Sequence, residues 1–150
     1  MFESILGSDF FFWLNMKMAR DTMLEKVFAI PARDFENASA EEQERILRIA
    51  RGTLPVSQRR KGLRNDLAIL ASSPRYPLER IATPTLVISI EDDLFGIYPG
   101  GRSAAERIPG ARFVSFPTGG HLWVGREGEV GLALTAFLNR SAAAKPARPR

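Results

Sequence analysis

A continuous apolar run at residues 85–90, TLVISI, limits what this chain can fold into. Its β-branched residues and its lack of polar alternation predict a strand buried on both faces of a parallel sheet. A second strand is expected at residues 111–116, ARFVSF, after a short helix around SAAERI that Pro109 and Gly110 close. This order is a βαβ unit, in which the two strands run parallel.

Two parallel strands do not form a stable sheet by themselves. Strands this apolar need neighbours along their edges and helices on both faces, and an open edge can pair with another chain. The 150 residues suffice for one ordinary domain. We therefore expect the chain either to assemble with a partner chain or to be the C-terminal part of a larger protein.

The residues before Pro84 follow helical periodicity. We expect one helix over 10–29 with Asp9 as its cap, and a second that begins at the S-x-x-E capping box of Ser39 and ends near residue 52. A third helix is expected over 55–71, because proline suits the first turn of a helix. A last helix is expected over about 127–138, after the second strand.

The chain is thus predicted to be α/β, with a helical region at 1–78 and an α/β segment at 79–140. The remaining residues, 141–150, read SAAAKPARPR and are predicted to form a disordered basic tail. Three of the four net positive charges lie in this tail, so the body is close to neutral. Without a basic and aromatic surface in the body, we expect no nucleic-acid partner.

Composition excludes several other classes of function. The chain has no cysteine, which rules out disulfides and thiolate sites. Its one histidine leaves few ligands for zinc, so neither a metal nor another cofactor is expected. The apolar stretch at 10–14 is far shorter than the roughly 20 residues that span a bilayer, so no membrane association is expected. It also lacks the flanks of a secretory signal, which predicts a cytoplasmic protein.

The single histidine, His121, follows the second predicted strand behind two glycines, and three acids at 91–93 follow the first. The carboxyl ends of adjacent parallel strands meet at one edge of a sheet, where sites commonly form. A carboxylate from the first loop should therefore reach the imidazole of the second. Such a pair fixes the ring's tautomer and stabilises the imidazolium that forms when the ring accepts a proton.

These two segments, IATPTLVISIEDD and ERIPGARFVSFPTGGH, resemble the last third of α/β-hydrolase-fold enzymes. The family pattern is T-P-T-L-V-hydrophobic-x-G-x-x-D, then a helix ending I-P-G-A, a strand, and G-x-G-H or G-G-H. The likeness covers about residues 80–140, and residues 1–78 resemble the family's helical cap. It implies that Asp93, with Asp92 as the alternative, is the catalytic acid and that His121 is the base. Ile90 departs from the family at the glycine position.

The nucleophile that this resemblance implies is missing. A serine on a G-x-S-x-G elbow should precede the cap, and this chain has no such motif. The nearest imitation surrounds Ser103, which lies after the acid and is expected to cap a helix instead. The oxyanion donors belong to the same missing part.

Aromatic residues suggest where a small-molecule substrate could bind. By resemblance, Phe12 and Trp13 lie in the cap above the site, and Trp123 follows the histidine by two residues; core packing is the alternative for each. They favour an apolar, uncharged substrate. The chain is therefore expected to be part of a hydrolase of carboxylic esters or similar bonds, or else a non-catalytic remnant or interaction module that packs against a partner chain.

Overall fold

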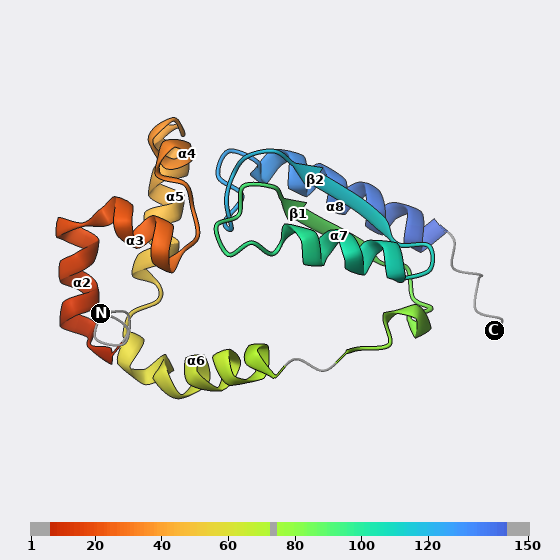
Figure 1. The fold of residues 1–150 in the computed structure, drawn as a ribbon. Coiled ribbons are helices and arrows are strands. Elements are labelled where there is room, and N and C mark those ends of the chain that lie inside the picture. The colour runs from red at the N-terminus through yellow and green to blue at the C-terminus, as the bar shows by residue number, and fades with distance from the viewer. Residues whose placement is uncertain (1–6, 73–74, 144–150) are drawn as a thin grey trace, which may run out of the picture.

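The computed structural model describes residues 7–72 and 75–143, and it shows a mixture of helices with one parallel pair of strands (Figure 1). None of the helices in these two ranges is long and apolar enough to cross a membrane. The elements, in chain order, are α2 (Asp9–Met18), α3 (Arg20–Val27), α4 (Ala32–Glu36), α5 (Ala40–Arg51), α6 (Val56–Ala71), a 3₁₀ turn η1 (Leu78–Arg80), β1 (Leu86–Ile90), α7 (Tyr98–Arg107), β2 (Arg112–Phe116) and α8 (Glu127–Ala143).

The single helix expected over 10–29 is wrong, because the chain bends at Ala19 (φ −139°, ψ 45°) and forms α2 and α3 instead. On one straight helix Phe12 and Leu24 would lie about 120° apart around the axis, and the bend allows both to be buried. The predicted cap is also wrong: Ser8 caps α2, while the Asp9 carboxylate accepts hydrogen bonds from the backbone N–H and the hydroxyl of Ser57.

The helices α5 and α6 confirm the other expectations for the first half. The Ser39 hydroxyl accepts the Glu42 N–H at 3.2 Å, as a capping residue should. The Glu42 carboxylate does not complete the box; it pairs with Arg45 and accepts the Gly125 N–H. The short helix α4 was not expected and begins directly after Pro31.

In the second half, β1 and β2 pair in parallel, with Ile90 opposite Phe116 at their carboxyl ends. The helices α7 and α8 flank this pair (Figure 1). α7 begins at Tyr98, five residues before the expected SAAERI segment, and Ser103 lies inside it rather than at its cap. A Cβ on Gly101 would lie 3.2 Å from the Ser89 hydroxyl oxygen, so the glycine lets this helix pack closely on β1.

Burial on both faces was expected for β1, and it is incomplete. Only the last two residues of the strand, Ser89 and Ile90, are buried, and the first three are half-buried. α8 extends to Ala143, so it includes the first residues of the predicted tail, and residues 144–150 lie outside the described residues.

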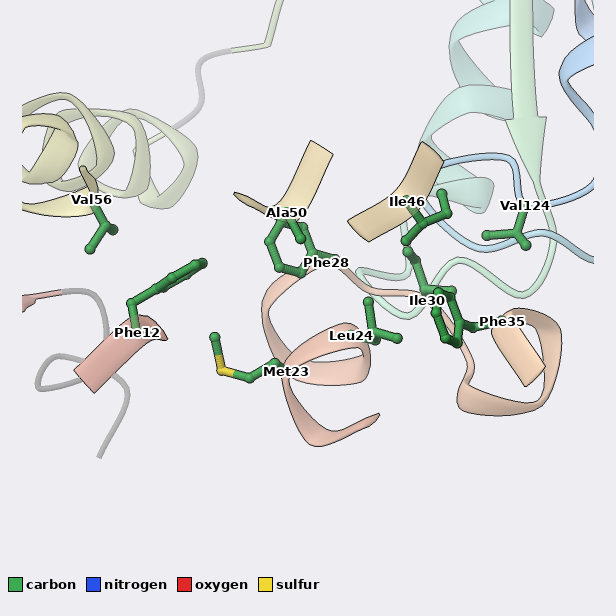
Figure 2. Packing of buried hydrophobic residues seen from close by; sticks show 10 residues of the cluster. All are labelled: Phe12, Met23, Leu24, Phe28, Ile30, Phe35, Ile46, Ala50, Val56 and Val124. Carbon is green, nitrogen blue, oxygen red and sulfur yellow. The ribbon is translucent and has the colours of Figure 1, made fainter. Parts of the chain in front are cut away.

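The main hydrophobic core lies in the helical half and not around the sheet. Figure 2 shows ten buried side chains from α2, α3, α4, α5, the start of α6 and the segments between them. One member, Val124, comes from the loop that follows β2. This contact anchors the histidine loop in the helical core.

Replacing Ile46 with Ala should lower the free energy of unfolding by about 2–5 kcal/mol, because the side chain is fully buried and its removal leaves a cavity. Ile49→Ala on the same helix is the matched control, since Ile49 is exposed and its loss should cost less than about 1 kcal/mol. Urea denaturation of both variants measures the difference. Equal losses of unfolding free energy in the two variants would show that Ile46 does not belong to the main hydrophobic core.

Candidate active site

The candidate site lies where the two strands end. Ile90 and Phe116 are partners at the carboxyl ends of β1 and β2, so the loops that follow them start side by side, as the sequence predicted. The first loop carries Asp92 and Asp93, and the second carries His121.

Asp93 and His121 are hydrogen-bonded. The imidazole Nδ1 lies 2.8 Å from Asp93 Oδ2, and Asp93 Oδ1 accepts the Phe95 N–H at 2.8 Å. The Asp93 side chain is 3% exposed, whereas that of His121 is 39% exposed. Two accepted hydrogen bonds satisfy the buried carboxylate, and the exposed ring faces solvent.

This geometry decides the tautomer of the neutral imidazole. A carboxylate only accepts, so the proton resides on Nδ1 and the lone pair on Nε2. Nε2 has no hydrogen-bond partner within residues 7–72 and 75–143. The ring of Phe95 packs edge-on against the imidazole, with centroids 4.8 Å apart, and limits how far it can turn. The pair is therefore arranged to accept a proton at Nε2, which is the chemistry of a general base.

One backbone carbonyl holds both loops together. The oxygen of Ala29 accepts the His121 N–H at 3.1 Å and the Leu94 N–H at 3.3 Å. Ala29 is fully buried and has a left-handed backbone (φ 52°), which turns its carbonyl toward the loops. The segment between α3 and α4 thus spans the site.

Two carboxylates hold the pair of glycines that precedes the histidine. Asp34 of α4 accepts the Gly119 N–H at 3.0 Å, and Asp92 accepts the Gly120 N–H at 2.9 Å. Arg33 forms ion pairs with both acids. Burial, followed by the neighbouring Asp92 carboxyl, raises the pKa of Asp34 above its ordinary value. Asp92, the alternative candidate for the catalytic acid, instead bonds to the loop that carries the histidine.

The loop beyond the histidine is held by a second ion pair. Arg45 donates to the Leu122 carbonyl at 2.8 Å, and Glu42, its partner on α5, accepts the Gly125 N–H at 2.9 Å. The Arg45 hydrogen bond is the largest of the influences that hold the pKa of Glu42 below its ordinary value. Residues 119, 121, 122 and 125 of the loop are thus bonded to the helical half.

None of the three aromatic candidates is the ring that packs against the imidazole, which is Phe95. Phe12 is 1% exposed and belongs to the core, which the sequence left open as the alternative (Figure 2). Trp13, next to it on α2, is 47% exposed and faces a shallow groove between α2 and α5. Trp123 is 41% exposed, with a left-handed backbone (φ 58°) between the inward-facing Leu122 and Val124.

No hydroxyl of a described residue bonds to the imidazole, and the chain has no G-x-S-x-G motif. The described residues also include no cluster of three acidic or histidine side chains that could hold a metal ion. Among the described residues, the reactive groups of the site are therefore the Asp93 carboxylate and the His121 imidazole.

Comparison with protein-family models, with curated proteins and with solved structures finds no match to this chain.

The residues that the sequence did not reveal are those that position the loops. Asp34 lies in a stretch expected to connect two helices, and Ala29 was expected to be the last residue of the first helix. They act through contacts with residues 85 and 92 positions away along the chain. The only local signal was Pro31, which ends the preceding helical pattern. Arg45 looked like an ordinary charged residue on an amphipathic helix.

Asp34→Ala should lower the free energy of unfolding by about 1–3 kcal/mol, because the buried Gly119 N–H loses its acceptor. Asp34→Asn keeps an acceptor oxygen and should lose less.

The raised pKa of Asp34 means that its ionisation opposes folding as pH rises through that pKa. The stability of Asp34→Asn relative to the original protein should therefore increase from acidic to neutral pH. Urea titrations at both pH values test this, and a difference independent of pH would contradict it.

Gly120→Ala should cost more than about 2 kcal/mol of stability, since its Cβ would lie 2.8 Å from Pro31 Cδ and 2.9 Å from Ile30 Cα, at a φ of 58°. Gly125→Ala is the matched control. It also has a positive φ, 71°, but nothing lies within 4 Å of its Cβ, so only the backbone penalty of about 1–2 kcal/mol applies. Thermal unfolding compares the two, and equal losses would show that the close packing is not required.

Proposed function

We propose that this chain carries the acid and the base of a hydrolase of the α/β-hydrolase fold, acting on carboxylic esters or similar bonds of apolar small molecules. The observation that supports this most directly is the Asp93–His121 hydrogen bond at the ends of two parallel strands, with Nε2 left free. The strands, the connecting helix and the two loops occur in the order that the sequence resemblance implies. The serine comes from a polypeptide segment outside these residues.

In this reaction His121 transfers one proton in each of the two halves. Its Nε2 takes the proton from the serine hydroxyl as the oxygen attacks the substrate's carbonyl carbon, and then gives it to the departing alcohol. Water next attacks the acyl-serine, again losing its proton to Nε2, and the acid leaves as the serine regains that proton. Asp93 keeps the ring oriented and balances the charge of the imidazolium throughout.

The exposed apolar surface of α8 supports a larger fold in which another segment covers it. Leu132, Leu134 and Leu138 are all exposed on this helix, and β1 pairs with no strand but β2 in the part of the chain that the structure describes. In a larger α/β sheet these leucines and the free edge of β1 would be covered. The same surface supports the second candidate function, a non-catalytic module that packs against a partner chain.

The reading frame upstream of the Met1 codon separates the two functions. An open frame that encodes further strands and a G-x-S-x-G elbow supports the hydrolase, and the longer protein is then assayed with p-nitrophenyl butyrate. The 150-residue chain should show only background turnover, equal to that of His121→Ala. Turnover by this chain that disappears in His121→Ala would show that the nucleophile lies within the 150 residues and not outside them.

In the longer protein Asp93→Asn should lower kcat by a factor on the order of 10⁴, because the ring loses the partner that sets its tautomer. Glu91→Gln is the matched control: Glu91 is an exposed acid two residues away and should be replaceable with little loss. Steady-state ester hydrolysis measures both variants. Full activity in Asp93→Asn would assign the acid's role to another residue.

A further inference from the structure

A cavity of about 290 Å³ lies in the helical half and reaches the loop after β1 at Phe95. Its walls come from α2, the end of α3, the segment before α6, α6 as far as Leu67 and the loop after β1, and its lining includes Phe12, Phe28, Val56, Leu63, Leu67 and Phe95. Figure 2 shows three of these side chains, Phe12, Phe28 and Val56, where α2, α3 and α6 approach one another.

The two polar side chains of this lining, Thr53 and Arg59, both donate to backbone carbonyls. The Thr53 hydroxyl donates to the Ala50 carbonyl at 2.7 Å, and the Arg59 guanidinium donates to the carbonyls of Thr53 and Gly52. The aliphatic stem of Arg59 can line the cavity while its guanidinium bonds to these carbonyls. The rest of the lining is hydrocarbon, so an apolar ligand is stabilised there mainly by its removal from water.

Phe95 connects this cavity to the acid–base pair. Its ring lines the cavity and also packs against the His121 imidazole at 4.8 Å. Its backbone N–H donates to Asp93, which fixes the start of the loop. A group inside the cavity is therefore one aromatic ring away from the proton-accepting histidine.

We propose that this cavity binds the uncharged hydrocarbon part of the substrate, a medium-length alkyl chain or a single aryl ring, with Leu67 at its mouth. The assignment rests on the proposed hydrolase function for the rest of the substrate. At roughly 30 Å³ for each small group, the volume admits on the order of ten non-hydrogen atoms. Leu67 lies at the mouth because it lines the cavity and is still 55% exposed.

Binding of octan-1-ol to the isotope-labelled chain tests this by NMR, with no nucleophile needed. We expect saturable shifts at the Leu63 and Leu67 methyl groups and at Phe95. Leu67→Trp should weaken binding at least tenfold, because the indole fills the mouth. Ile69→Trp is the matched control, since Ile69 is exposed on the same helix but does not line the cavity, and it should bind as the original protein does.

Octanoate serves as the charged probe and should bind more than tenfold more weakly than octan-1-ol, since moving a carboxylate from water into this mostly apolar cavity carries a desolvation penalty. Shifts that do not saturate, equal binding by Leu67→Trp, or tighter binding of octanoate would each overturn the proposal. These results are independent of hydrolysis. Binding without ester turnover in the longer protein would reject the hydrolase but keep the cavity, and turnover without binding would reject the cavity alone.

Discussion

The site depends on the carbonyl of Ala29. This one oxygen accepts the N–H of His121 from the second loop and the N–H of Leu94 from the first, so it holds together the loops that carry His121 and Asp93. Because two strands alone give the loops little support, their geometry comes from the helical half that surrounds them. The Asp93–His121 hydrogen bond follows from this arrangement.

The helical half supplies further contacts of the same kind. Asp34, Glu42 and Arg45 bond to backbone groups of residues 119–125, and Val124 inserts into the hydrophobic core. The result is a rigid support around a ring that stays accessible. A general base needs both properties, since its orientation must be fixed while its free nitrogen meets the substrate.

The opposite side of the molecule is much less complete. The outer residues of α8 are exposed leucines, and β1 has a partner on one side only in the described ranges. Soluble proteins seldom leave such surfaces uncovered. The proposed hydrolase function rests on this contrast between the well-packed loops and the open sheet.

The sequence by itself determined the two parallel strands, the helices α5 and α6, and the pairing of a carboxylate with the lone histidine, because periodicity, capping residues and strand order are local signals. It did not predict the bend at Ala19, the helix α4 or the roles of Asp34 and Ala29. The roles of Asp34 and Ala29 depend on contacts with residues 85 and 92 positions away in the chain, which no local pattern reveals. The tertiary structure alone decided which acids hold the glycines and that Phe12 belongs to the core, and it selected Asp93 over the alternative Asp92 as the partner of the imidazole.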